Sequence, residues 1–375
     1  MRKQLRIFVM LFLGLGAVLP IPAMRVKGMY RLQNSSGNIT DRHNAKTSQQ
    51  VQSFGVKTVR PLDRNNLWIV AQSMTQEPFA YHVYIIHSSD GGRSWEMKLR
   101  ESARDLNDIF FIDNKVGWIC GSGGLILKST DGGKGWSEQD TPTEDDLNEI
   151  QFINAENGWA ASGKGEVLRT TDGGRHWTSH RINVQGELFV LSFRDNMNGW
   201  LIGHENQAYE STDGGVSWKS RADDLARLVA TSGWYQAYFQ AVKFLGPKVG
   251  FIAAHVVTDN VDKNIVFKTE DGGHRWEVLF DQQGFVMNSA EFMSENKMWM
   301  ILQNGALVLH TEDGGRIWSK VSTVPSSEMI HLYFVDPRNG WAKEGNAFSN
   351  RLYYTTDGGK NWSQSDWSRI TLNRK

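Results

Sequence analysis

Short apolar stretches alternate with glycine-rich polar turns along most of this 375-residue chain. Between residues 106 and 136 the stretches LNDIFFID, VGWICG and LILKST follow one another, and the phrase DGGKGW separates them from a further short stretch. Stretches this short, divided by turns of this kind, predict β-strands joined by hairpins rather than helices. These residues therefore predict one four-stranded antiparallel sheet.

A phrase of the form Ser/Thr-x-Asp-Gly-Gly-x-x-Trp follows the third predicted strand, and it occurs seven times. Its aspartates are Asp90, Asp131, Asp172, Asp213, Asp271, Asp313 and Asp357. Its closing tryptophans are Trp95, Trp136, Trp177, Trp218, Trp276, Trp318 and Trp362. Successive aspartates are 41, 41, 41, 58, 42 and 44 residues apart, and a four-stranded propeller blade has this length. The pattern predicts an all-β fold, a seven-bladed β-propeller of four-stranded antiparallel blades with one copy of the phrase in each.

The residue types of the phrase have a structural explanation. Two consecutive glycines accept positive φ angles and so permit a tight hairpin. The aspartate before them can accept hydrogen bonds from backbone N–H groups across the turn, and the Ser or Thr hydroxyl can add another. The closing tryptophan can cover the turn with apolar surface. We therefore expect the seven aspartates to be structural acceptors and not catalytic bases.

A second position recurs in the second predicted strand of each blade. It reads Gly117-Trp118, Gly158-Trp159, Gly199-Trp200 and Gly340-Trp341, with Leu67-Trp68, Gly250-Phe251 and Met298-Trp299 as variants. We expect this aromatic residue to pack between neighbouring blades. The alternative is a ring of exposed aromatic side chains that binds sugars.

Composition excludes some classes of function. The 41 basic and 41 acidic residues balance, which argues against a general attraction to nucleic acid or to an anionic membrane. The single cysteine, Cys120, excludes an intrachain disulfide and is expected to be a small buried side chain. The ten histidines show no spacing typical of metal ligands, so no metal and no cofactor is predicted.

The N-terminal segment predicts export. Residues 1–23 combine a basic start, an apolar run of 13 residues from Ile7 to Leu19 and a small residue at Ala23, as a cleaved signal peptide does. An uncleaved anchor is the alternative. We expect a flexible lead-in over residues 24–53, the propeller over residues 54–368 and a C-terminal tail over residues 369–375. The mature protein is then expected in the periplasm or outside the cell.

The repeated phrase is the Asp-box, or BNR repeat, and the stretch from Leu147 to Trp177 resembles the photosystem II assembly/stability factor family of bacteria and plastids. The resemblance extends from Val56 to Trp367, although Glu270 and Glu312 replace the usual threonine before the box aspartate. It implies an exported, non-enzymatic seven-bladed propeller that holds other proteins during assembly. The implied function is a scaffold or assembly factor for a membrane or envelope protein complex.

Asp-boxes also occur in sialidases, which leaves a sialidase-like glycoside hydrolase or a glycan-binding lectin as alternatives. A sialidase needs an arginine cluster for the substrate carboxylate and a Tyr–Glu nucleophile pair. Its N-terminal signature places Ile-Pro or Leu-Pro after an arginine, and the nearest match, Arg60-Pro61-Leu62, has the wrong order. We therefore predict no catalytic residues.

Extra residues indicate where a partner binds. In a four-stranded blade the turn after strand two and the crossover to the next blade lie opposite the turn after strand three, which carries the Asp-box. Blades one and five have long connections after strand two, and the crossover from Trp218 to Phe239 is ten residues longer than that from Trp136 to Leu147. Insertions gathered on one face often mark a binding face. The candidate residues for binding a protein partner are Trp234, Tyr235, Tyr238, Phe239, Arg221, Arg227, Phe79 and Tyr81. The alternative is that the aromatic residues pack the insertion onto the propeller.

Overall fold

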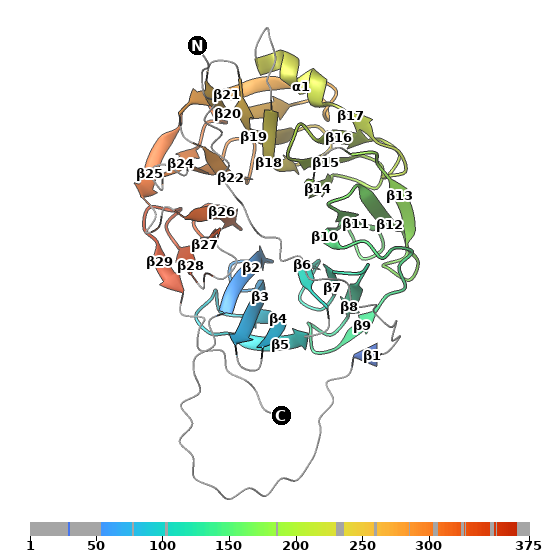
Figure 1. Cartoon of the computed structure of the whole chain (residues 1–375). Coiled ribbons are helices and arrows are strands. Elements are labelled where there is room, and N and C mark those ends of the chain that lie inside the picture. The colour runs from blue at the N-terminus through green and yellow to red at the C-terminus, as the bar shows by residue number, and fades with distance from the viewer. Residues whose placement is uncertain are drawn as a thin grey trace, which may run out of the picture.

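Seven antiparallel sheets, six of four strands and one of five, surround a common axis in the computed structural model of the protein (Figure 1). The structure describes residues 29–30, 54–76, 79–101, 104–184, 187–229, 236–258, 261–284, 286–302, 307–323, 326, 328–345, 349 and 351–365. The predicted seven-bladed propeller is confirmed. The predicted signal peptide and C-terminal tail lie outside the described residues, as does the lead-in apart from residues 29–30.

Each blade is a meander of four consecutive strands, and blades are numbered here from 1 to 7 in chain order. The innermost strands are β2 (Phe54–Pro61), β6 (Leu106–Phe111), β10 (Leu147–Phe152), β14 (Leu188–Phe193), β18 (Gln236–Phe244), β22 (Met287–Phe292) and β26 (Met329–Phe334). The second strands are β3 (Leu67–Gln76), β7 (Gly117–Gly121), β11 (Gly158–Ser162), β15 (Gly199–Gly203), β19 (Gly250–Val257), β23 (Met298–Leu302) and β27 (Gly340–Glu344). The third strands are β4 (Phe79–Ser88), β8 (Ile126–Ser129), β12 (Glu166–Thr170), β16 (Ala208–Ser211), β20 (Asp262–Thr269), β24 (Leu307–Thr311) and β28 (Leu352–Thr355).

The outer strands are short and more exposed. They are β5 (Glu96–Glu101), β9 (Trp136–Glu138), β13 (Thr178–Arg181), β17 (Lys219–Ser220), β21 (Glu277–Gln283), β25 (Ser319–Thr323) and β29 (Ser363–Ser365). The two-residue strand β1 (Met29–Tyr30) pairs with β9 as a fifth strand of the blade 2 sheet. The helix described in the chain, α1 (Ala222–Val229), lies in the crossover from blade 4 to blade 5.

Aromatic stacking joins most neighbouring blades. Trp118 of blade 2 stacks on Phe152 of blade 3, with ring centroids 3.5 Å apart, and Phe152 meets its own blade's Trp177 edge to face at 5.9 Å. Equivalent stacks join Trp68 to Phe111, Trp159 to Phe193, Phe251 to Phe292 and Trp299 to Phe334. The aromatic residue of the second strand therefore packs between blades. The alternative of an exposed sugar-binding ring is wrong, because these side chains are at most 2% exposed.

The glycine before that aromatic residue is explained by the same packing. A Cβ atom on Gly158 would lie 2.4 Å from the ring of Phe152, which covers the strand from the same blade. The equivalent glycines of blades 2, 4, 5 and 7 meet their own phenylalanines in the same way. In these five blades a residue without a side chain leaves room for the ring, whereas blade 6 has Met298 paired with Phe292 at the same position.

The Asp-box hydrogen bonds repeat in all seven blades. In blade 2 the Ser129 hydroxyl donates to Asp131 Oδ1 at 2.9 Å, and that oxygen accepts the N–H groups of Lys134 and Gly135. The Gly133 N–H donates to the Ser129 hydroxyl at 2.9 Å. These bonds to its charged form lower the pKa of Asp131 against the opposing effect of burial. The Oδ1 oxygen of Asp131 therefore braces its own turn.

The ring closes between blades 7 and 1 without a strand shared between them among the described residues. The Val56 N–H of β2 donates to Ser349 O at 3.0 Å, and the Ser365 hydroxyl of β29 donates to Gly92 O at 2.9 Å. Pro61 stands in blade 1 where blades 2 to 7 have a phenylalanine, so the aromatic stack found at five of the other joints is not repeated here.

Candidate partner-binding face

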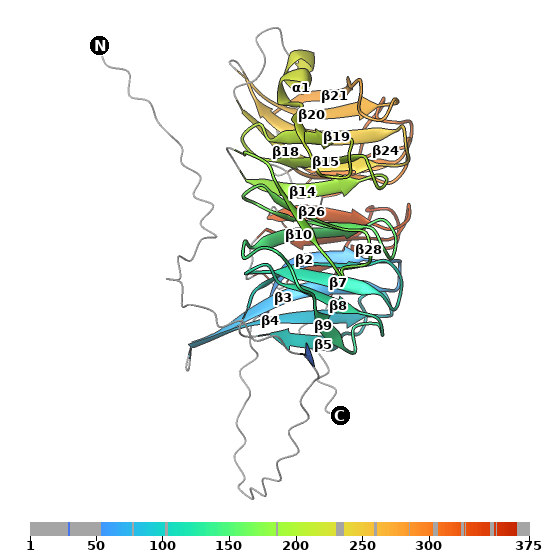
Figure 2. The same cartoon turned by 90° about the vertical axis from the view of Figure 1, so that its right-hand side faces the viewer.

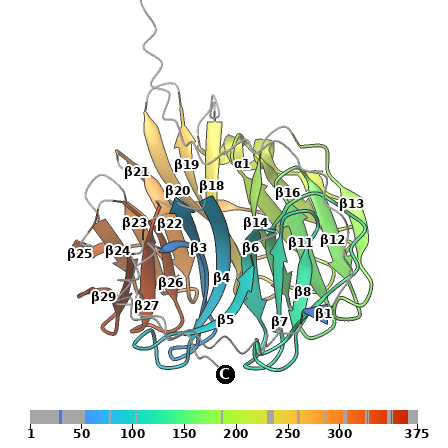
Figure 3. The same ribbon diagram turned by 60° about the horizontal axis from the view of Figure 1, so that its bottom comes forward.

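The two faces of the ring are distinguished by hydrogen bonds. In every blade the first glycine of the Asp-box donates its N–H to a carbonyl in the turn between the first and second strands, as Gly132 does to Lys115 O at 2.9 Å. These two sets of turns therefore share one face, called the box face. The turns after the second strands and the crossovers lie on the opposite face, called the insertion face. The extended β3–β4 hairpin projects from this face in Figure 2, and α1 lies at its rim in Figure 3.

The hairpin of blade 1 carries two of the candidate residues. Tyr81 of β4 is half-buried, and its hydroxyl donates to Gln72 Oε1 at 2.8 Å and lies 3.1 Å from Asp105 Oδ1. Burial, followed by the nearby carboxylate of Asp105, raises the pKa of Tyr81 well above its ordinary value. Tyr81 thus ties the hairpin to blade 2. Phe79 is the first residue of β4, and its side chain lies outside what the structure describes.

The crossover helix is anchored by one of the two candidate arginines. Arg221 pairs with Glu210 of β16 and with Asp224 of α1, both at 2.7 Å, and its side chain is only 11% exposed. Arg221 therefore positions α1 and offers little surface to a partner. Arg227 is 69% exposed and pairs with Asp224 within the helix. Leu225 fixes the other side of α1, because it is fully buried in the core shared by blades 4 and 5.

The aromatic candidates of the crossover separate into different environments. Phe239 is 1% exposed and belongs to the core cluster of Trp200 and Trp276. Its assignment as a surface contact is therefore corrected, and the packing alternative holds for this residue. Tyr238 is partly exposed on the insertion face. Trp234 and Tyr235 lie outside the described residues.

A polar network near the axis was not predicted from the sequence. Arg60 of β2 binds Asp108 of β6 through Nε at 2.8 Å and Nη2 at 2.9 Å, and Nη2 lies 3.3 Å from Glu149 of β10. Asp108 Oδ2 also accepts the Ile150 N–H at 3.1 Å, and Glu149 Oε2 accepts the Leu191 N–H at 2.6 Å. Burial raises the pKa of Glu149, and the Arg60 charge opposes that shift.

These contacts show how backbone N–H groups along the inner edge of the ring find hydrogen-bond acceptors. Each innermost strand has a free edge, and a side chain from one blade accepts an N–H of the next. Arg60, the nearest counterpart of a sialidase signature, is paired with Asp108 and Glu149. The sequence does mark this network, because polar residues occupy the same position in three of the innermost strands. They are Asp108, Glu149 and Ser289.

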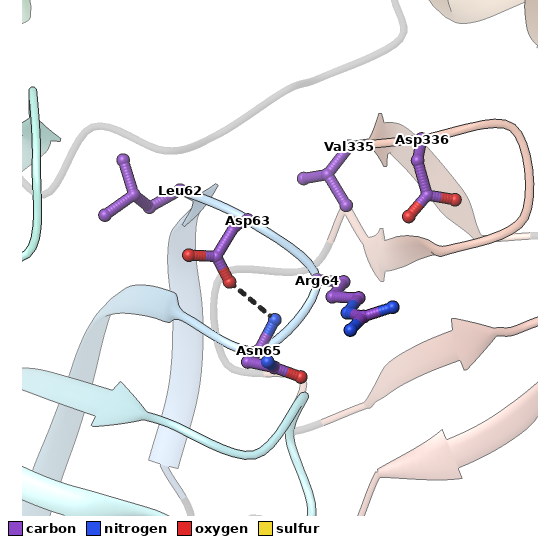
Figure 4. Close-up of a pocket in the computed structure, with 6 residues that line it drawn as sticks. All are labelled: Leu62, Asp63, Arg64, Asn65, Val335 and Asp336. Atoms are coloured by element: carbon purple, nitrogen blue, oxygen red, sulfur yellow. Dashed lines mark hydrogen bonds between the residues drawn. The ribbon is translucent and has the colours of Figure 1, made fainter.

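The described residues contain a small pocket on the box face between blades 1 and 7 (Figure 4). It encloses about 360 Å³ and is lined by Leu62, Asp63, Arg64, Asn65, Val335 and Asp336. Asp63 Oδ1 accepts the Asn65 N–H at 2.7 Å, so this carboxylate braces the β2–β3 turn. Within the described part of the chain, no group of three or more His, Cys, Asp or Glu side chains could hold a metal ion. No described helix has the length and apolar character needed to span a bilayer.

Comparison with known proteins agrees with this architecture. The family model of the photosynthesis system II assembly factor YCF48 matches residues 88–188 and 177–258, and the BNR/Asp-box repeat matches residues 353–364. The resemblance to the photosystem II assembly factor family is confirmed. Among curated proteins, no sequence matches the chain.

Solved structures of this family share the fold. A structure titled YCF48 bound to D1 peptide is 18% identical, with a TM-score of 0.58 over 78% of this chain and 90% of that chain. YCF48 from Cyanidioschyzon merolae is 19% identical, with a TM-score of 0.54 over 72% and 87% of the two chains. The GH74 xyloglucanase from Xanthomonas campestris is 11% identical, with a TM-score of 0.59 over 85% of this chain and 55% of that enzyme. At these identities the likeness is one of fold, and the enzyme's activity does not transfer to this chain.

Proposed function

We propose that the protein is an exported, non-enzymatic scaffold that binds a protein partner on the insertion face, in the manner of an assembly factor for an envelope or membrane complex. The observation that carries the proposal is the position of the extra residues. The β3–β4 hairpin, the β19–β20 hairpin and the α1 crossover all lengthen the same face. The similarity to the YCF48 family supports the choice of a protein partner, since one structure of that family is titled as bound to a peptide.

The charged groups near the axis and in the boxes are engaged in structural contacts, which supports a non-enzymatic function. Arg60, Asp108 and Glu149 bind one another and neighbouring backbone groups. The Asp-box carboxylates accept the N–H groups of their own turns. A general acid or nucleophile needs a polar atom that faces substrate.

Site-specific photo-crosslinking tests the binding face. Cys120 is buried, and burial raises the pKa of its thiol, so a new surface cysteine can be labelled selectively with a benzophenone maleimide. Leu228→Cys places the label on α1, where Leu228 is 41% exposed. The matched control, Ile317→Cys, places it on a box turn, where Ile317 is 68% exposed. We expect a discrete crosslinked protein when the purified, labelled Leu228→Cys protein is irradiated in a cell-envelope extract, and none with Ile317→Cys.

The opposite result would overturn the assignment of the face. A crosslink from Ile317→Cys alone would move the partner to the box face. Turnover of sialosides or xyloglucan by the purified protein would replace the scaffold with a glycoside hydrolase. Export is tested separately, by protease protection of the protein in intact and in osmotically shocked cells.

A further inference from the structure

A ladder of aromatic rings crosses the insertion face where blade 4 meets blade 5. Phe189 of β14 lies 4.3 Å from His204, and His204 lies 5.2 Å from Tyr238 of β18, measured between ring centroids. Tyr238 in turn lies 6.2 Å from His255 of β19, with which it is paired in the sheet. Phe189, His204 and Tyr238 are each partly exposed. These four residues are called the aromatic ladder below.

The ladder departs from the repeat at the positions that build it. Phe189 occupies the bulge of its innermost strand, and the same bulge position holds Asn107 in blade 2 and Asn288 in blade 6. The amides of those asparagines donate to carbonyls of the next blade at 2.9 and 2.8 Å. A phenylalanine cannot make that hydrogen bond, so its partly exposed ring is not explained by the joint between blades.

The turn beside the ladder is held in an unfavourable backbone conformation. Glu205 and Asn206 have φ angles of 55° and 68°, where the equivalent turn of blade 2 has Gly123 and Gly124 at 63° and 69°. The equivalence follows from matching hydrogen bonds, because His204 donates its N–H to Glu187 O as Ser122 does to Asp105 O. A glutamate rarely adopts this conformation. The turn is nevertheless fixed to blade 5, since Asn206 Oδ1 accepts the Ala237 N–H at 2.7 Å.

The strained turn adds a carboxylate to an acidic border around the rings. Glu187, Glu205 and Asp262 are exposed. The charges of Glu187 and Glu205 act to raise the pKa of His204 against the larger lowering by burial. Burial first, and then the charges of Glu205 and Asp262, raise the pKa of Tyr238. Within the described residues, Glu187 and Glu205 have no ion pair, and Asp262 has only His255 Nε2 at 3.8 Å.

We infer that the aromatic ladder and its three carboxylates bind an arginine side chain of a protein partner. A planar guanidinium stacks on aromatic rings and pairs with carboxylates, which matches the two kinds of group presented here. A negative border of three carboxylates complements one or more cationic side chains and repels an acidic segment. The inference rests on the proposed function, because it names the chemistry of the partner on the same face.

Binding of a single side chain tests the inference directly. The probe is N-acetyl-arginine amide, and its neutral analogue N-acetyl-citrulline amide is the chemical control. In full-length protein labelled with ¹³C-histidine, we expect saturable shifts of the His204 and His255 ring signals with arginine and not with citrulline. Glu205→Gly, which copies the residue of blade 2, is expected to weaken binding by about fivefold or more while raising the melting temperature.

Matched variants separate a specific site from a general charge effect. Glu312→Gln removes a 68% exposed carboxylate on the box face and is expected to leave arginine binding unchanged. Equal shifts with citrulline, or an unchanged affinity in Glu205→Gly, would overturn the inference. If arginine binds but no partner crosslinks through Leu228→Cys, the proposed function fails and the site stands. If a partner crosslinks there and arginine does not bind, the site fails alone.

Discussion

The ring of Trp118 lies flat on the ring of Phe152, with 3.5 Å between centroids and 8° between planes, and the two residues belong to different blades. Both side chains are buried, and Trp118 also donates its Nε1–H to Gly173 O at 3.3 Å. Phe152 therefore contacts the preceding blade as well as its own. Equivalent stacks occur at five of the seven joints, between blades 1 and 2, 2 and 3, 3 and 4, 5 and 6, and 6 and 7.

Removing one ring of the stack is the first prediction. We expect Phe152→Ala to lower the free energy of unfolding by about 3–5 kcal/mol, because it deletes a buried ring and leaves a cavity between two blades. Ile317→Ser, at a 68% exposed position, is the control and is expected to change it by less than about 0.5 kcal/mol. Urea denaturation measures both. A loss below about 1 kcal/mol in Phe152→Ala would contradict this role of the stack.

Adding one carbon atom beneath the same ring is the second prediction. In Gly158→Ala the new Cβ meets Phe152 at 2.4 Å, so we expect a loss of about 1–3 kcal/mol from overpacking. Gly123→Ala is the comparison, since its Cβ meets no atom within 4 Å and only its φ of 63° opposes the substitution. We expect it to cost roughly 1 kcal/mol. Equal losses in the two variants would show that packing against Phe152 does not govern Gly158.

A buried lysine at the joint of blades 7 and 1 is the basis of the third prediction. Lys343 of β27 is 5% exposed, and among the described residues its ammonium group donates one hydrogen bond, to the carbonyl of Glu344 at 3.4 Å. The equivalent residue is Cys120 in blade 2 and Ala161 in blade 3. Burial lowers the pKa of Lys343 to about 8. We expect Lys343→Met to stabilise the protein at pH 7, by an amount on the order of 1–3 kcal/mol.

The pH dependence gives the sign of this effect. The folded state releases the Lys343 proton near pH 8, whereas the unfolded chain keeps it to about pH 10.4. The unfolded state therefore binds more protons between these values, and stability from this group rises with pH through that window. Thermal melts of the wild type from pH 7.5 to 10 should show this rise relative to Lys343→Met. Parallel curves for the two proteins would contradict it.

The Asp-boxes give a fourth prediction at acid pH. The pKa of each of the seven box aspartates is lowered. Burial acts to raise each pKa, and the hydrogen bonds that the charged carboxylate accepts outweigh that effect. Stability from these groups is present above their unfolded pKa of about 3.9 and is lost as pH falls through the folded values. We expect the melting temperature to fall steeply below pH 4. Asp131→Asn should be less stable at pH 7 and lose less on acidification, and an unaltered acid slope would contradict the assignment.

The blades could be predicted because each recurring motif marks the same turn or strand in every blade. The seven boxes mark the third turn of every blade, and the Gly-Trp position marks the second strand. Phe111, Phe152, Phe193 and their equivalents recur at the end of the innermost strand, and this recurrence also indicates the repeat. Arg60, Asp108 and Glu149 come together only when three blades are placed around the axis, so their spacing in the chain does not predict the contact.

The partner-binding residues were harder to predict for a physical reason. Tyr238 and Phe239 are neighbours in β18, and successive side chains of a strand point to opposite sides. Tyr238 therefore faces solvent and Phe239 faces the core, so the prediction that Phe239 is a surface contact is wrong. Phe189 and Glu205 are conspicuous only by comparison with the same positions in other blades.

Blade 7 holds blade 1 through side chains and a few hydrogen bonds, without an interlocking strand among the described residues. Under a pulling force, or in the slow opening events that native-state hydrogen exchange detects, this seam is the point where the circle should part first. The amides of Val56 and its neighbours would then exchange earlier than those of blades 3 and 4. The protein would then behave as a linear series of seven blades whose ring is closed at a single joint.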